Sequence, residues 1–130
     1  MEKIKSIQTN KAPAAIGPYA QANIAGGFAY VSGQIAIDPK TGALVTGAIE
    51  VQTERVLENL KAVLEAAGSD LDSVVKTTVY LTDINDFAKM NAVYAQYFGG
   101  KRLPARSAMQ VVALPRGALV GIEAIALSDT

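Results

Sequence analysis

The fold class follows from the stretch IEVQTERVLENLKAVLEAAG, residues 49–68, and from the segments on either side of it. Between Ile49 and Ala67 the apolar residues recur at helical spacing and fall on one face: Val56, Leu57, Leu60, Val63, Leu64 and Ala67. Glu50 lies in the expected first turn, where a negative charge suits the helix dipole, and Gly68 is the expected stop. This stretch therefore predicts an amphipathic helix with one buried face.

A second helix is predicted from Ile84 to Phe98, with Asp83 as its N-cap and Gly99-Gly100 at its end. Its inward stripe consists of Phe87, Met90, Tyr94, Tyr97 and Phe98. The rest of the chain reads as strands near Lys3–Gln8, Gln21–Ala25, Phe28–Ile37, Val74–Leu81, Ala105–Ala113 and Ala118–Leu127. The order β-β-β-α-β-α-β-β favours the α+β class.

Two short segments have the composition of turns. Asp38-Pro39-Lys40-Thr41-Gly42 follows the third strand, with Pro and Gly at turn-favouring positions. Leu114-Pro115-Arg116-Gly117 separates the last two strands and predicts that they form a hairpin.

Composition limits the chemistry. The 130 residues suit one domain, 1–130, and half of them are hydrophobic. Twelve basic residues balance twelve acidic ones, so charge predicts neither a nucleic-acid nor a membrane partner. The chain has no His and no Cys, which removes the usual metal ligands and the Ser–His and Cys–His dyads. We therefore expect no metal and no cofactor, with acid–base work left to Asp, Glu, Tyr, Lys or the substrate.

Location and assembly can also be addressed from the sequence. No signal peptide follows Met1, and no apolar run approaches the roughly 20 residues of a membrane span, so the cytoplasm is the expected compartment.

The last strand is apolar on both faces, with Ile122 on one and Ile125 on the other. Two helices can cover only one face of such a sheet, so we expect the second face to pack against other subunits.

Arg106 interrupts an apolar strand, where a charge needs a partner. A structural ion pair is one interpretation. The other is a guanidinium that awaits a ligand carboxylate, which it can bind through two parallel hydrogen bonds. Glu123 interrupts the next strand in the same way. In the predicted hairpin Glu123 shares a face with Arg106, one diagonal step of roughly 7–8 Å away, so an Arg–Glu contact stays open.

Three further residues are candidates for contact with a ligand. Tyr19 follows Gly17-Pro18 in a predicted loop and serves either as a packing aromatic or as a ligand hydroxyl. Ser32 and Gly33 follow a strand, and Gly33 would allow a ligand to approach the backbone closely.

Taken together, these segments resemble the RidA (YjgF-type) family over essentially the whole chain. The resemblance rests on the order and spacing of Ala12-Pro13-Ala14-Ala15-Ile16-Gly17-Pro18-Tyr19, Ser32-Gly33-Gln34-Ile35, Gln52-Thr53, Asn59-Leu60, Ala66-Ala67-Gly68, Val75-Lys76-Thr77-Thr78-Val79, Asn85-Asp86-Phe87, Asn91, Pro104-Ala105-Arg106-Ser107 and Ile122-Glu123-Ala124-Ile125-Ala126. It implies a chorismate-mutase-like α+β fold, with a six-stranded mixed sheet and two helices on one face. It also implies a homotrimer with active sites between subunits.

The resemblance further implies hydrolysis of 2-imino acids, chiefly 2-iminobutanoate and 2-iminopropanoate, to 2-keto acids and ammonia. Such imines leak from pyridoxal-phosphate-dependent dehydratases, so this is metabolite damage control. The resemblance places Arg106 on the substrate carboxylate and Tyr19, Ser32, Gly33 and Asn91 in or beside the pocket. The position of Ala108 contributes to the pocket wall through its backbone N–H.

Two positions depart from the family pattern. Ala108 stands where many members have a Cys that the mechanism does not require. Gly121 stands where active members carry the Glu that activates water, and Glu123 matches the next acidic position on the same sheet face. Two hypotheses follow: an imine deaminase, at full or reduced rate, in which Arg106, Tyr19 and Glu123 act, or a module that binds small 2-keto acids without efficient turnover. RNA cleavage, reported in the wider family, is disfavoured by zero net charge and the lack of His.

Overall fold

The computed structural model describes residues 3–128. Its strands and helices follow the predicted order: β1 (Lys5–Ile7), β2 (Ala22–Ala25), β3 (Phe28–Gln34), α1 (Ile49–Ala66), β4 (Val74–Leu81), α2 (Phe87–Tyr97), β5 (Ala105–Gln110) and β6 (Val120–Leu127). The second helix is preceded by a 3₁₀ turn over Ile84–Asp86, and the Asp83 side chain caps this turn by accepting the N–H of Asn85. None of the helices within residues 3–128 combines the length and apolarity that crossing a bilayer requires.

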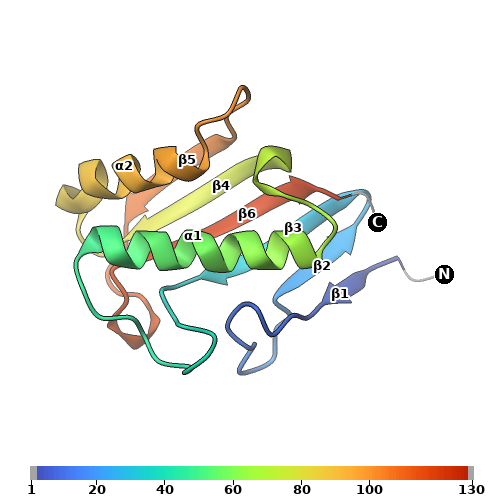
Figure 1. Cartoon of the computed structure of the whole chain (residues 1–130), viewed down its shortest axis with the longest axis horizontal. Coiled ribbons are helices and arrows are strands. Elements are labelled where there is room, and N and C mark those ends of the chain that lie inside the picture. The colour runs from blue at the N-terminus through green and yellow to red at the C-terminus, as the bar shows by residue number, and fades with distance from the viewer. Residues whose placement is uncertain (1–2, 129–130) are drawn as a thin grey trace.

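The strands form one six-stranded sheet in the order β1-β2-β3-β6-β4-β5. Every neighbouring pair is antiparallel except β4 and β5, which run parallel. Both helices lie across the same face of this sheet (Figure 1). The predicted α+β fold, a six-stranded mixed sheet with two helices on one face, is therefore confirmed.

The predicted hairpin between the last two strands is wrong. Strand β4 lies between β5 and β6, and both pair with it. The Val111 N–H donates to the Leu81 carbonyl and the Thr82 N–H donates to the Leu119 carbonyl, so the segment 111–119 passes around the end of β4. The turn signal itself is real, because a 3₁₀ turn forms over Pro115–Gly117. A local turn signal fixes only the change in direction and does not decide which strands become neighbours.

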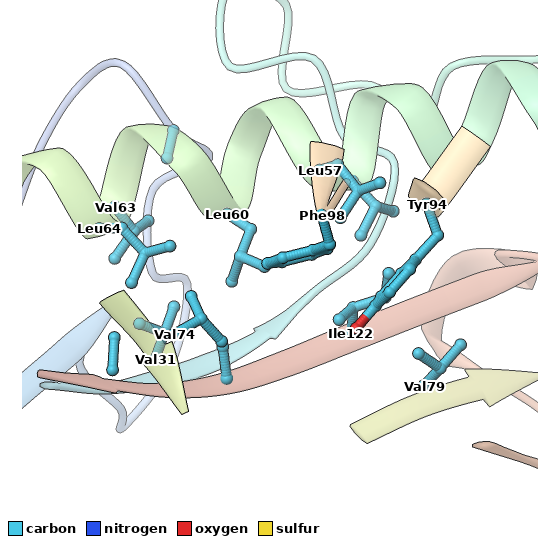
Figure 2. Packing of buried hydrophobic residues seen from close by; sticks show 14 of the residues in the cluster. Val31, Leu57, Leu60, Val63, Leu64, Val74, Val79, Tyr94, Phe98 and Ile122 are labelled. Atoms are coloured by element: carbon cyan, nitrogen blue, oxygen red, sulfur yellow. The ribbon is translucent and has the colours of Figure 1, made fainter. Parts of the chain in front are cut away.

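The core lies between the helices and the sheet. Leu57, Leu60 and Leu64 of α1 are fully buried, and they point toward the strands together with the rings of Tyr94 and Phe98 from α2 (Figure 2). These two rings lie 4.6 Å apart between centroids, a tilted arrangement that adds to the area they bury. The helix stripes predicted from spacing are the faces that pack.

A β-bulge in β3 changes which residues face the core. Val31 pairs with Ala124 and Gln34 pairs with Ile122, so three steps along β3 match two steps along β6. The extra residue lies at Ser32-Gly33. As a result Gln34 is buried under the helices beside Ile122, whereas without the bulge it would point to the other face.

The sheet face opposite the helices, here called the open face, is uncovered in the single chain. The rows across it include Tyr30–Ile125–Lys76 and Glu123–Thr78–Ser107. Large apolar side chains on this face are exposed, among them Tyr30, Met109 and Leu127. The open face is thus partly apolar, with Lys76 and Glu123 among the aromatic and aliphatic groups.

Candidate functional site

Arg106 lies on the edge strand β5 and its side chain points to the helix face of the sheet. Its register partner on β4 is Thr77, which is buried beneath α2. The Arg106 Nη1 donates to the Oδ1 of Asn91 over 2.6 Å. The guanidinium carbon lies 4.7 Å from the centroid of the Tyr94 ring and 5.3 Å from that of Phe87. We call Arg106, Asn91, Phe87 and Tyr94 the arginine site.

Helix α2 sets the geometry of the arginine site. Phe87, Asn91 and Tyr94 are four and three residues apart, so they share one face of the helix. The Tyr94 hydroxyl lies 2.7 Å from the Oγ1 of buried Thr77, which ties the ring to the sheet. Burial raises the pKa of Tyr94, while the bond to Thr77 and the charge of Arg106 oppose the shift. Tyr94 is therefore a neutral ring over which the cation rests.

The structure rules out the contact between Arg106 and Glu123 that the sequence analysis left open. Arg106 pairs with Thr77 of β4 and Glu123 pairs with Thr78, and consecutive residues of a strand point to opposite faces, so Arg106 lies on the helix face and Glu123 on the open face. Among residues 3–128 no carboxylate forms an ion pair with Arg106, whose side chain is exposed. The guanidinium is planar, lies against two rings and has no carboxylate partner within residues 3–128. It is therefore suited to bind the carboxylate of a ligand.

Ala108 follows Arg106 on the same face of β5, because its partner Val79 is buried. Backbone N–H groups alternate in direction along a strand. Since the N–H of Val111 points to β4, that of Ala108 points away from β4 at the free edge of the sheet. The predicted role of this N–H thus has a suitable geometry beside the arginine site.

A cavity of about 580 Å³ lies at the end of the open face where β3 stops and β6 starts. We call it the open-face cavity. Its lining is mainly apolar, with a few polar groups: Pro13, Ala14, Ile16, Tyr19, Gln21, Gly33, Gln34, Ile35, Ile37, Tyr80, Leu114, Pro115, Arg116 and Gly121. Arg116 is the one charged residue in this lining, and its Nη2 donates to the Gly42 carbonyl over 3.1 Å. Predominantly apolar walls with few polar groups are typical of small-molecule sites.

Buried amides and hydroxyls hold the loop that carries Tyr19. The Gln21 side chain is buried, and its amide donates to the carbonyls of Thr9 and Pro13. The Ser32 hydroxyl donates to the Ala20 carbonyl over 2.6 Å. Ser32 therefore fixes the loop beside the cavity, and this hydrogen bond occupies its one proton.

A second buried amide holds the opposite wall. Asn59 of α1 is fully buried, and its Nδ2 donates to the carbonyls of Ile35 and Ile37 over 3.1 and 2.8 Å. The Nε of Arg55 donates in turn to the Asn59 side-chain oxygen. Because both isoleucines line the cavity, this amide fixes the wall from behind.

Gly121 and Gly33 leave open space in the cavity wall. A Cβ at Gly121 would lie 3.6 Å or more from its neighbours, which is ordinary contact. A Cβ at Gly33 would meet nothing within 4 Å. A side chain at position 121 could therefore begin without a clash at its Cβ, beside the cavity that Gly121 lines.

Tyr80 is a cavity residue that the sequence analysis missed. It is the register partner of Gly121, and its hydroxyl donates to the Oε1 of Glu123 over 2.7 Å. That hydrogen bond, followed by burial, raises the pKa of Tyr80. Glu123 shares the open face with Gly121, as predicted, but it reaches the cavity lining only through Tyr80. The alternation of β4 could have placed Tyr80 on this face, but only the register pairs it with Gly121.

The predicted site residues thus form two groups within one chain. Arg106, Asn91 and Ala108 lie together on the helix face at the β5 edge. Tyr19, Gly33 and Gly121 line the open-face cavity, with Ser32 behind it and Glu123 beside it. No group of three or more metal-ligating side chains occurs within residues 3–128.

Comparison with known proteins identifies relatives over nearly the whole chain. Residues 9–128 match the family model described as Endoribonuclease L-PSP. A 2-iminobutanoate/2-iminopropanoate deaminase of Mus musculus is 54% identical over 95% of this chain and 90% of its own length. A Yersinia pestis structure assigned to the conserved Rid protein family superposes with a TM-score of 0.93 at 52% identity, covering 95% of this chain and 98% of that one. Escherichia coli TdcF with bound serine superposes with a TM-score of 0.91 at 42% identity, covering 96% of this chain and 99% of that one.

Proposed function

Because the chain belongs to the RidA (YjgF-type) family, we propose that it hydrolyses small 2-imino acids such as 2-iminobutanoate and 2-iminopropanoate to 2-keto acids and ammonia. The observation that carries the proposal is Arg106, a guanidinium held against two rings with no carboxylate of its own. The name of the mouse relative supports the reaction, and the serine bound to the Escherichia coli relative supports a small ligand with a carboxylate.

In this proposal the arginine site binds the carboxylate and thereby orients the imine. The guanidinium fork donates two parallel hydrogen bonds to the two carboxylate oxygens. Asn91 accepts from Nη1 and limits rotation of the fork, so less side-chain entropy is lost on binding. The outward N–H of Ala108 supplies a further donor at the same edge. Water then attacks C2 of the imine, and ammonia leaves after proton transfer.

The other half of the proposed site comes from a second copy of the chain. The arginine site lies on the helix face and the open-face cavity on the opposite face, so one chain does not join them around one substrate. A contact between two different surfaces closes into a ring when its rotation permits. We therefore propose a homotrimer in which the Arg106 of one subunit faces the cavity of the next, with Tyr19 and Gly33 in the wall.

Gly121 supports a second candidate function, a module that binds 2-keto acids with little turnover. Binding depends on Arg106, while the family's water-activating carboxylate is missing at position 121. The two candidates share a ligand and differ in chemistry. RNA cleavage, which the description of the family model names, ranks below both. The net charge is zero, the chain has no His, and the cavity lining has one cation.

An ammonia-release assay separates the two candidates. 2-Iminobutanoate is generated in the cuvette by a dehydratase, and ammonia is followed with and without the protein. Acceleration in proportion to protein concentration is expected for the deaminase. Binding of 2-ketobutanoate without any acceleration would instead leave the binding module as the function.

A further inference from the structure

The open-face cavity contains a tyrosine in contact with a carboxylate beside the missing glutamate. Tyr80 and Gly121 are register partners on adjacent strands, and both line the cavity. The Tyr80 hydroxyl donates to Glu123 over 2.7 Å. Of the two tyrosines that line the cavity, only Tyr80 has a carboxylate partner within residues 3–128.

We propose that Tyr80 is a catalytic residue, and that Tyr80 and Glu123 form a proton relay that takes the place of the carboxylate missing at position 121. This inference rests on the proposed imine hydrolysis. It assigns the contact with water to Tyr80, whose oxygen retains lone pairs while its proton lies on the bond to Glu123. Glu123 acts through Tyr80 and does not itself touch the water.

The relay balances protons and electrons through both halves of the reaction. The water oxygen bonds to C2 of the protonated imine, and the C=N π pair moves to nitrogen. One water proton passes to the Tyr80 oxygen while the Tyr80 proton passes to Glu123, which leaves a neutral carbinolamine. Glu123 then returns its proton through Tyr80 to the amine. The C2–N bond breaks, C2=O forms, and the hydroxyl proton leaves with ammonia as ammonium.

The surroundings keep the relay in the required protonation state. The raised pKa of Tyr80 means that the phenol stays protonated at neutral pH, so a proton is always present to move toward Glu123. Tyr80 is partly covered whereas Glu123 is exposed, so the carboxylate stands in water and the phenol lies between it and the cavity lining. A hydroxyl between water and a carboxylate transfers charge without placing a bare carboxylate in the apolar cavity.

The test compares Tyr80→Phe with Tyr30→Phe in the ammonia-release assay. Tyr30 is an exposed tyrosine on the same open face and does not line the cavity, so Tyr30→Phe is the matched control. General acid–base groups contribute about 10²–10⁴-fold. We expect Tyr80→Phe to lower kcat at least tenfold with KM within about threefold, since the carboxylate anchor is unchanged. Tyr30→Phe should retain both constants.

A second arm places Tyr80→Phe in a Gly121→Glu background. A carboxylate at position 121 can take the water proton directly, so the effect of Tyr80→Phe on kcat should shrink to less than about threefold. An unchanged kcat for Tyr80→Phe in the original chain overturns the relay while the deaminase stands. Equal losses in both backgrounds mean that Tyr80 is structural, which also overturns the relay. If the unmodified protein releases no ammonia, the proposed function fails and the relay with it.

Discussion

The arginine site and the open-face cavity are built from different kinds of structure. Arg106 stands on a strand and is held by Asn91, Phe87 and Tyr94 of one helix, so its contacts come from regular elements. The cavity is formed largely by loops, and its walls are fixed from behind by Gln21 and Asn59. Sites on regular elements hold geometry more tightly than sites on loops. In the proposed function, the carboxylate would therefore be held by the more rigid of the two half-sites, and the rest of the substrate would meet walls made largely of loops.

In the proposed function the two half-sites belong to different copies of the chain, so the prediction about oligomeric state has the largest expected effect. Light scattering at micromolar concentration should give about three times the 13.6 kDa of one chain. The partly apolar open face is expected to be covered in that assembly. A stable monomer that still releases ammonia would place the whole reaction on one chain and end the division into two half-sites.

Removal of the Arg106 guanidinium tests the recognition half alone. A hydrogen bond to a charged group contributes about 1.5–3 kcal/mol, so Arg106→Ala should weaken 2-ketobutanoate binding by more than tenfold. Titration calorimetry or NMR measures the affinity. Arg106→Lys is the matched control, since it keeps the charge and loses the fork. Unchanged affinity in a folded Arg106→Ala protein would make this cation structural.

Gly121→Glu tests the cavity half alone. A Cβ at position 121 makes only ordinary contacts, so we expect the fold to be retained. Because a general base is worth about 10²–10⁴-fold, we expect the rate of ammonia release to rise at least tenfold, with much less change in keto-acid binding. Glu123→Gln in the original chain is the control. If Gly121→Glu has no effect while Glu123→Gln removes activity, the existing carboxylate is sufficient.

Tyr94→Phe should have the smallest effect on ligand affinity, and it separates the structural role of the Tyr94 hydroxyl from the role of its ring beside Arg106. The change keeps the ring next to Arg106 but leaves the hydroxyl of buried Thr77 without its partner. Chemical denaturation should show a loss of about 1–3 kcal/mol in unfolding free energy. Affinity for 2-ketobutanoate should stay within a few-fold, whereas Tyr94→Leu should lower both. A tenfold loss of affinity in Tyr94→Phe would mean that the hydroxyl orients Arg106.

The sequence predicted the helices and strands better than it predicted which strands lie next to each other in the sheet. The first helix and the strand Val74–Leu81 appear almost as predicted, because hydrophobic spacing and Gly68 are local signals. The placement of Arg106 relative to Glu123 was wrong, because strand order depends on contacts between segments distant in sequence. Both residues lie on the strands expected of them, yet their register with the intervening β4 places them on opposite faces.

The sequence analysis named most of the residues of the candidate site, but it did not predict which of them lie together in the folded chain. Tyr19, Gly33 and Gly121 do line one cavity, and Asn91 does contact Arg106. Tyr80 gave no signal, since a tyrosine in a strand rich in Val and Thr is ordinary. Its significance comes from the register with Gly121, which no local pattern encodes.

Because of the bulge at Ser32-Gly33, the side chains that form the cavity wall depend on the number of residues in this segment as well as on their identity. Beyond it the side chains of Gln34 and Ala36 are buried, while Ile35, Ile37 and part of Gln34 line the cavity. Deleting one residue here would remove the bulge, and every side chain beyond it on this segment would point to the other face of the sheet. The two isoleucines would turn into the core, and an amide and a methyl group would form the wall in their place. Homologues that differ in length by one residue at this point would present chemically different pockets on the same backbone fold, even with every other residue retained.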